Sequence, residues 1–182
     1  ALLKQLAATA DVLVENFRPG TLEKWGLGWE TLSERNPGLI MVRISGYGQT
    51  GPYRDRPGFG VIGEAMGGLR YLSGHPDQPS VRVGISIGDS LSALYGVIGA
   101  LLALQERHRS GQGQYIDVAL YESVFAMMES LIPEYDGADV IREPSGSALP
   151  GITPSNAYPC ACKESAGGEY VLIAGNGDSI FK

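Results

Sequence analysis

The residues best suited to covalent chemistry lie in the stretch Gly84-Ile85-Ser86-Ile87-Gly88-Asp89-Ser90, where Asp89 stands at the expected start of a long apolar helix. Asp is among the commonest residues at a helix start, so the spacing alone favours a capping role. The alternative is a nucleophile. The helix N-terminus favours the anion, Gly84 and Gly88 leave it without side-chain cover, and an ionised carboxylate can attack a thioester. Ser90 could cap in its place, so the spacing leaves both interpretations open.

A metal site is not expected. The only cysteines, Cys160 and Cys162, form a C-x-C pattern on an expected strand, and the two histidines, His75 and His108, lie far from them in sequence. Cysteines placed in this way are more often reduced core residues than metal ligands. They favour a reducing compartment, so we expect a cytoplasmic protein.

The composition excludes several classes of partner. A net charge of −6 argues against nucleic acid, which requires clustered Lys and Arg, but leaves room for an anionic ligand held by a few cations. With 43% hydrophobic residues the chain is expected to be globular and soluble, because apolar runs such as 97–104 are too short to cross a bilayer. The sequence begins within a helical pattern and stops where another starts, so we expect an interior piece of a longer protein.

The elements that would position Asp89 form an α/β pattern. Apolar residues at helical spacing in 1–10 predict a helix, and a short strand should follow at 11–15. Helices beginning at Thr21 and Thr31 then precede a continuous apolar strand, Leu39–Ile44. Such a strand suits a sheet covered on both faces. After a Gly- and Pro-rich region, 45–86, which holds a short helix at 61–69, comes the helix at Asp89–His108.

That helix has two apolar faces: a stripe of large residues, and a face of small residues that another element can approach closely. The small residues are Gly96, Gly99, Ala100 and Ala103; the stripe comprises Leu91, Leu94, Tyr95, Ile98, Leu101, Leu102 and Gln105. A strand at 115–120 and a core helix at 121–132 should follow. We expect 1–135 to belong to a large domain, 136–155 to be a linker, and 156–182 to open a small domain with a hairpin of strands at 156–162 and 169–174.

A series of short motifs carries a resemblance to a known family. These motifs are Glu15-Asn16-Phe17-Arg18-Pro19-Gly20, Gly26-Leu27-Gly28, Asn36-Pro37, Gly46-Tyr47-Gly48-Gln49-Thr50-Gly51-Pro52 and Gly88-Asp89. In order and approximate spacing, from residue 1 through 176, the chain resembles the class III coenzyme A transferases of CaiB/BaiF type, which include formyl-CoA transferase and carnitine CoA-transferase.

The resemblance implies a function for particular residues. Asp89 matches the catalytic aspartate, which becomes an acyl anhydride and then an aspartyl-CoA thioester. Asn16, Phe17 and Arg18 lie at the turn that faces the CoA moiety, and Lys24 falls where relatives often carry an Arg near the nucleotide. The implied fold is a Rossmann-like large domain, here partial, with the start of a smaller α+β domain, in an interlocked homodimer. Acyl-CoA and a carboxylic acid would be the substrates, with no tightly bound cofactor.

Three other functions are weaker. An α-methylacyl-CoA racemase looks similar but carries a His after the glycine that matches Gly58, and Phe59 cannot transfer a proton. A CoA-binding fragment without turnover stays open because the chain is expected to be truncated, although Asp89 argues against lost activity. Relatives typically have an acidic residue where this chain has Gly60, and this departure concerns the lining of the acyl pocket. A nicotinamide site at Gly46-x-Gly48-x-x-Gly51 would need a helix directly after the glycines, which Pro52 opposes.

The sheet is expected to be incomplete in this chain. If strands that should precede residue 11 are absent, Val12, Leu13, Val14, Ile40 and Val42 would be left exposed. Exposed apolar surface invites association. We therefore expect the isolated chain to be poorly soluble or partly unfolded, and the parent protein to be a stable dimer.

Overall fold

The computed structural model describes residues 2–161 and 168–181, which form two compact units. Unit 1 comprises Ala1–Leu69 and Val83–Ile132; unit 2 comprises Arg70–Arg82 and Pro133–Lys182. The elements of unit 1 are α1 (Leu2–Ala7), β1 (Val12–Glu15), α2 (Thr21–Lys24), α3 (Trp29–Ser33), β2 (Ile40–Ser45), α4 (Gly60–Met66), α6 (Ile87–Ser110), β3 (Tyr115–Ala119) and α7 (Leu120–Phe125). Those that lie mostly or wholly in unit 2 are α5 (Leu69–Leu72), α8 (Leu131–Ala138), β4 (Ser155–Pro159), β5 (Tyr170–Ala174) and α9 (Asp178–Phe181).

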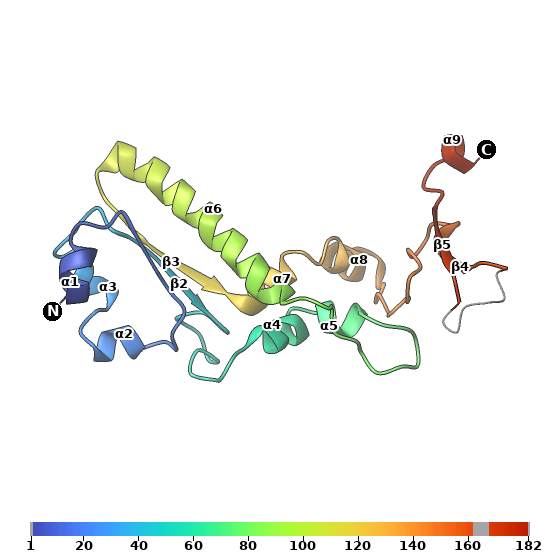
Figure 1. Ribbon diagram of the computed structural model, residues 1–182, viewed down its shortest axis with the longest axis horizontal. Coiled ribbons are helices and arrows are strands. Elements are labelled where there is room, and N and C mark those ends of the chain that lie inside the picture. Colours follow the sequence, from blue (N-terminus) through green and yellow to red (C-terminus); the bar gives the residue numbers. More distant parts are fainter. Residues whose placement is uncertain (1, 162–167, 182) are drawn as a thin grey trace. The chain divides into compact units, whose positions relative to one another are not determined.

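Unit 1 is built on a parallel sheet of three strands in the order β1-β2-β3. The central strand β2 is almost wholly buried, as its continuous apolar sequence predicted. One of its faces, with Met41, packs against the leucines of α2 and α3. The other face, with Ile40 and Val42, packs against α6. Figure 1 shows α6 lying along one face of the sheet, so the expected α/β architecture is confirmed.

Coverage by α6 corrects one expectation about exposed residues. Ile40 and Val42 were expected to lie open, but they are 0% and 2% exposed because the small face of α6 closes over them. At the edge strand, Val14 is 65% exposed, as predicted. The exposed apolar surface of this sheet therefore lies at its β1 edge and not on the face beneath α6.

The start of α6 differs from the sequence expectation. The helix begins at Ile87, so Asp89 is its third residue and Ser86 occupies the N-cap position without a side-chain cap bond. The Ser90 hydroxyl donates back to the carbonyl of Ser86 at 3.0 Å, so Ser90 does not cap either. The capping interpretation of Asp89 was therefore wrong. The helix ends as its sequence indicates, at Gly111 in the left-handed region (φ 72°).

The small-residue face of α6 is the buried one. A Cβ added at Gly96 would lie 3.2 Å from Val42, and one at Gly99 would lie 2.9 Å from Ile116, so the helix rests directly on β2 and β3. The large stripe faces outward instead: Leu94, Ile98, Leu101 and Leu102 are 52–66% exposed. By length and composition α6 could also span a membrane. The sequence analysis did not predict this, because it considered only uninterrupted apolar runs such as 97–104.

We predict that this stripe drives self-association of the isolated 182-residue chain. Replacing Leu94 and Leu101 by Gln should raise the dissociation constant of the associated species at least about tenfold, because burial of one leucine side chain contributes about 1.5–3 kcal/mol. Sedimentation velocity over a range of concentrations measures this. Leu2→Gln with Leu6→Gln, which removes two exposed leucines from α1, is the matched control. Equal sedimentation of both double variants would contradict the prediction.

Two shorter expected helices also differ from the structure. The helix expected at 61–69 is α4 followed by α5, and the helix expected at 121–132 ends at Phe125. Beyond Phe125 the chain turns tightly. The backbone N–H groups of Met127 and Met128 donate to the carbonyls three residues earlier, and Glu129 has a positive φ of 51°. Only part of its expected stripe is core, since Val124 and Met128 are buried while Phe125 is 48% exposed.

Unit 2 contains the expected hairpin. Strands β4 and β5 pair antiparallel, with Ser155 opposite Ala174 and Pro159 opposite Tyr170. Cys160 follows β4 as a free thiol, whereas Cys162 and most of the expected hairpin link lie outside the described residues. Part of the expected linker is helical, because α8 continues to Ala138. The domain boundaries expected at 135 and 155 remain predictions.

Candidate active site

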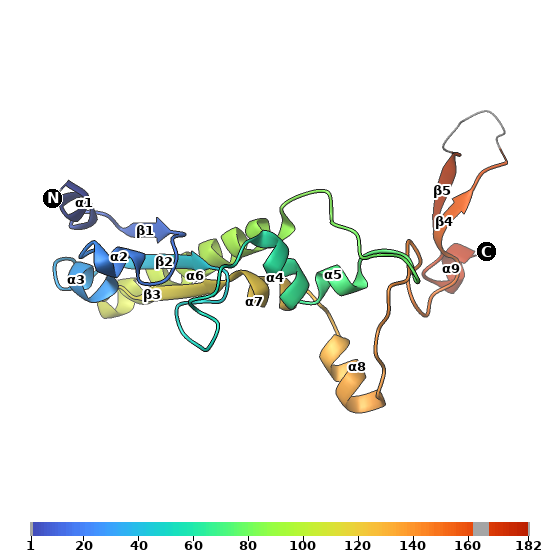
Figure 2. The same cartoon turned by 90° about the horizontal axis from the view of Figure 1, so that it is seen from below.

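The carboxyl ends of the three parallel strands meet at one edge of the sheet, the usual place for a ligand site in an open α/β sheet. The turn 16–20 follows β1, the glycine-rich loop follows β2, and α7 follows β3. Figure 2 shows α4 and the start of α6 at this same edge. The sequence motifs that are far apart along the chain are therefore brought to one end of unit 1.

A series of close contacts made by glycines leads from the end of β2 to Asp89. A Cβ on Gly46, directly after β2, would lie 2.5 Å from Cα of Gly58, so these two backbones touch. Two residues later, a Cβ on Gly60 would lie 2.7 Å from Oδ2 of Asp89. A Cβ on Gly88 would in turn lie 3.2 Å from the carbonyl oxygen of Gly60. Close backbone contacts thus run from the end of β2 through Gly58 and Gly60 to Gly88, the residue before Asp89, and they fix the backbone that carries the carboxylate.

Asp89 has the properties that a nucleophile requires. It is exposed in the first turn of α6, where the helix dipole favours a negative charge. The adjacent Gly88 is buried against α4 and Val124, which fixes the backbone that carries the carboxylate. An exposed, backbone-anchored carboxylate can attack an electrophilic carbonyl carbon.

An ion triad with two buried members, Arg43 and Glu15, and the more exposed Glu23 supports the turn after β1. Nε of Arg43 donates to Oε1 of Glu15 at 2.6 Å, and Nη1 donates to Oε1 of Glu23 at 2.6 Å. The second Glu15 oxygen accepts the backbone N–H of Phe17 at 2.8 Å. The side chains of Arg43 and Glu15 are only 6% and 3% exposed. The triad therefore connects the middle of β2 to the backbone of the turn 16–20.

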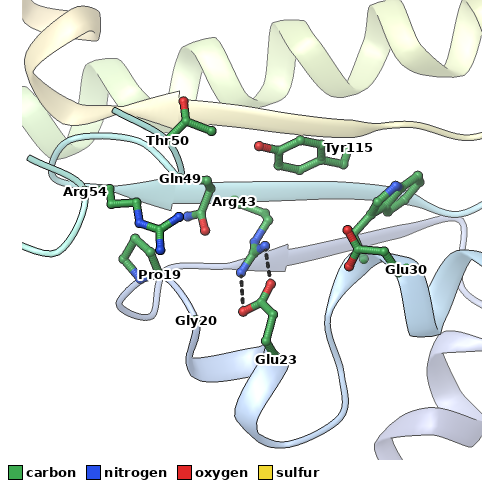
Figure 3. Close-up of a pocket in the computed structure, with 10 residues that line it drawn as sticks. Pro19, Gly20, Glu23, Glu30, Arg43, Gln49, Thr50, Arg54 and Tyr115 are labelled. Atoms are coloured by element: carbon green, nitrogen blue, oxygen red, sulfur yellow. Dashed lines mark hydrogen bonds and ion pairs between the residues drawn. The ribbon is translucent and has the colours of Figure 1, made fainter. Parts of the chain in front are cut away.

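The triad also changes the protonation of its more exposed member. The hydrogen bond from Arg43 is the main reason that the pKa of Glu23 lies below its ordinary value. Figure 3 shows the paired contact between the Glu23 carboxylate and the Arg43 guanidinium. The sequence analysis did not predict this triad. Its available signal was a single Arg within an otherwise apolar strand, which must find an acidic partner.

The four predicted CoA contacts lie together on the turn and on α2. Asn16, Phe17, Arg18 and Lys24 are all exposed. The Phe17 ring meets Trp25 edge-on, with 5.3 Å between centroids, and this contact joins the turn to the end of α2 beside Lys24. Helix α2 packs on the sheet face opposite α6, so these residues and Asp89 approach the carboxyl edge from opposite faces. Their roles remain predictions.

A polar cavity of about 290 Å³ adjoins the turn 16–20 (Figure 3). Glu23 and Arg43 line one part of it, and Gln49 and Arg54 line another. Gln49 is 8% exposed, and its buried Nε2 has no hydrogen-bond partner among the described residues. The cavity thus offers charged and polar groups beside the predicted CoA contacts, a feature that the sequence did not indicate.

The loop after β2 is held by Asp117 of β3. The backbone N–H of Gln49 donates to Oδ2 of Asp117 at 2.8 Å, and Gly48 has a φ of +82° that brings its backbone against the same carboxylate. Partial burial raises the pKa of Asp117, and the Gln49 N–H opposes that effect. After Gly51 the next helix begins only at Gly60, so the loop lacks the helix that a dinucleotide fingerprint requires.

The structure places no histidine of unit 1 beside Asp89. His108 lies 19 residues further along the same helix, a separation of roughly 28 Å at 1.5 Å per residue. Phe59, where a racemase would carry its His, is the N-cap residue of α4 and is 70% exposed. His75 belongs to unit 2. The described part of unit 1 therefore has no histidine beside Asp89 that could serve as the second proton-transfer group of a racemase.

Comparison with known proteins gives a consistent result. The model of CoA-transferase family III matches residues 1–182. The succinyl-CoA–D-citramalate CoA-transferase of Chloroflexus aurantiacus is 58% identical over 100% of this chain and 44% of its own length. The beta subunit of succinyl-CoA–L-malate CoA-transferase from the same organism is 50% identical over 99% of this chain and 44% of its own length.

A solved structure has the same fold. The crystal structure of a CaiB/BaiF family protein from Brucella suis superposes with a TM-score of 0.85 and 36% identity, covering 95% of this chain and 44% of that one. The chain therefore spans less than half the length of these relatives.

Proposed function

The chain belongs to CoA-transferase family III, and from that premise we propose that its full-length protein transfers CoA between two carboxylic acids through a covalent intermediate on Asp89. The observation that carries the proposal is the placement of the Asp89 carboxylate, exposed at the start of α6 and seated against Gly60. The exposed turn 16–18, which follows β1 at this edge, and the exposed Lys24 of α2 would bind the CoA moiety.

The proposed first half-reaction proceeds in two steps. The Asp89 carboxylate attacks the thioester carbonyl of the donor, and the CoA thiolate leaves to give a mixed anhydride. The thiolate then attacks the Asp89 carbonyl of that anhydride, which releases the donor acid as a carboxylate and leaves an aspartyl-CoA thioester. Bonds and charge balance at each step, because one thiolate is released and one consumed.

The second half-reaction reverses these steps with another acid. Its carboxylate attacks the aspartyl thioester, the thiolate leaves, and a second anhydride forms. The thiolate then attacks the acyl carbon of the new acid, so the product is its CoA thioester and Asp89 is regenerated. No step needs an α-proton transfer, which fits a site that has Phe59 where a racemase would have His.

We further propose that the substrates are short dicarboxylic acids, with succinyl-CoA as the donor. The two relatives described above are named for succinyl-CoA together with citramalate and malate, and both are at least 50% identical to this chain. A homodimer remains part of the proposal.

The test is an exchange assay with the full-length protein. Succinyl-CoA is incubated with citramalate, malate, mesaconate, glutarate and, as a monocarboxylate control, butyrate; mass spectrometry detects each new thioester. We expect transfer to at least one dicarboxylate and a kcat/KM at least about tenfold lower for butyrate, since a missing charged contact typically costs more than 1.4 kcal/mol. A parallel reaction in deuterium oxide with a 2-methylacyl-CoA should show no label at the α-carbon. Label uptake without CoA exchange would refute the proposal in favour of racemase chemistry.

A further inference from the structure

A group of three tyrosines at the carboxyl edge of the sheet holds the side chain of an arginine. Tyr47 lies two residues after β2 and Tyr121 two residues after β3, and their ring centroids are 6.0 Å apart. Tyr47 also meets Tyr53 edge-on, with 5.5 Å between centroids. The guanidinium of Arg56 lies over the Tyr53 ring, 4.2 Å from its centroid. A continuous series of contacts therefore connects this guanidinium to the ends of two strands.

The positive charge of Arg56 has no acidic partner in the part of the chain that the structure describes. The neighbouring Arg54 pairs with Asp55 at 3.5 Å, whereas the Arg56 side chain makes neither an ion pair nor a hydrogen bond with a described residue. A guanidinium placed over an aromatic ring can still donate N–H groups in pairs to a carboxylate. Because Tyr53 already restricts this exposed side chain, less freedom is lost when an anion binds.

Arg56 is also close to Asp89 along the backbone. It lies four residues before Gly60, so the two Cα atoms are at most about 14 Å apart. Gly60 in turn adjoins the Asp89 carboxylate, with 2.7 Å between Oδ2 and a Cβ built on Gly60. The backbone between them is fixed at Gly58 by its contact with Gly46. This separation is within the combined reach of an arginine side chain and a four-carbon diacid.

The other cations near this edge have different partners or roles. Arg43 is held between Glu15 and Glu23. Arg54 pairs with Asp55 and lines the polar cavity, and the exposed cations of the turn and of α2 are the predicted CoA contacts. A diacid that reacts through one carboxylate carries a second one, which needs a cation or water as its partner. In the described part of unit 1, Arg56 is the arginine of this edge that remains for it.

We propose that Arg56 binds the second carboxylate of a dicarboxylic substrate and thereby makes the enzyme prefer diacids to monoacids. The proposal rests on the function proposed above, and it gives a physical cause for a substrate class that so far rests on the names of relatives. Arg56 contacts the carboxylate that is not exchanged. It should therefore affect recognition of the acid and leave the chemistry at Asp89 unchanged.

The test uses the full-length protein and two acids of nearly the same shape. These are ¹³C-labelled succinate and succinamate, in which an uncharged amide replaces the second carboxylate. Unlabelled succinyl-CoA is the donor, and mass spectrometry measures each new thioester. The proposed covalent mechanism is ping-pong, so kcat/KM for an acid reports the half-reaction with that acid. In the parent this value should be at least about tenfold higher for succinate, because a hydrogen bond to a charged group contributes that much.

Variants of Arg56 should remove this preference. Arg56→Gln should lower kcat/KM for succinate at least about tenfold and leave the value for succinamate within about threefold. Arg56→Lys keeps the charge but loses the paired N–H groups, so its preference should lie between those of parent and Arg56→Gln. Tyr53→Leu removes the ring beneath the guanidinium and should reduce the preference about two- to fivefold. Arg35→Gln, at an exposed arginine after α3, is the matched control and should keep the parental preference.

The outcomes separate this proposal from the mechanism at Asp89. An unchanged preference for succinate in Arg56→Gln would overturn the role of Arg56. An equal loss for both acids would also overturn it, because Arg56 would then bind a group that both reactions share, such as a phosphate of CoA. Transfer at the parental rate by Asp89→Asn would instead reject the nucleophile, whatever the result at Arg56.

Discussion

Replacing Asp89 by Asn in the full-length protein is expected to lower kcat for CoA transfer by at least about a thousandfold, on the scale seen when other covalent enzymes lose their nucleophile. The amide has nearly the shape of the carboxylate, so it should fill the same space against Gly60. It carries no charge and cannot form the anhydride. Discontinuous assay of the new thioester measures the loss, and mass spectrometry should find no covalent CoA adduct.

This loss can be separated from unfolding. Asp89 is the third residue of α6 and not its cap, so it contributes to the helix mainly as a charge in the first turn, worth about 0.3–1 kcal/mol. Thermal unfolding of Asp89→Asn should therefore differ little from the parent. Glu106→Gln, near the other end of α6, is the matched acid-to-amide control and should keep full activity. Parental turnover in Asp89→Asn would remove this residue from the mechanism.

The sequence predicted the three strands and the long helix of unit 1 because each had a local cause. The apolar run in β2 required cover on both faces, and the Gly111 stop required a left-handed residue; both features appear in the structure. The local sequence was sufficient wherever the backbone conformation of one residue, or the spacing of apolar residues, determined the element.

The sequence could not decide contacts that depend on two distant segments. Periodicity gave α6 two apolar faces, but only the distance to β2 and β3 shows that the small face is buried and the large one exposed. The contacts of Gly46 with Gly58 and of Gly60 with Asp89 likewise join segments that are distant in sequence, and no local pattern indicates that they meet. The helix α6 begins at Ile87, two residues before the expected start, and Gly88 in its first turn packs against Gly60 of α4, a contact that the sequence does not reveal.

Arg43 is the position where a single change should most affect stability. Arg43→Met keeps the length and apolar stem of the side chain but removes the charge between Glu15 and Glu23. The Glu15 side chain is 3% exposed, so its carboxylate would remain buried without its cation. Loss of one partner from such a pair costs about 3–5 kcal/mol. Urea unfolding of the full-length protein at pH 7 should show a loss of this size.

The pH dependence of stability gives an independent check on the pairing of Glu23 with Arg43. A lowered pKa means that Glu23 adds stability at pH values above its ordinary pKa of 4.5, and that this contribution disappears as the pH falls through the lowered value. The parent should therefore lose stability on acidification over this range, and Arg43→Met should lack the part due to Glu23. A flat difference between parent and variant from pH 7 to pH 3 would show that Glu23 gains nothing from Arg43.

The double variant Arg43→Met with Glu15→Gln separates charge from packing. It leaves no buried charge, and the amide oxygen of Gln can still accept the N–H of Phe17 that Glu15 accepts in the parent. We expect it to recover at least about half of the stability lost in Arg43→Met, because buried ion pairs can be replaced by uncharged residues at little cost. If the double variant is less stable than Arg43→Met, the buried charge is not the cause, and the guanidinium must support the turn 16–20 through its hydrogen bonds instead.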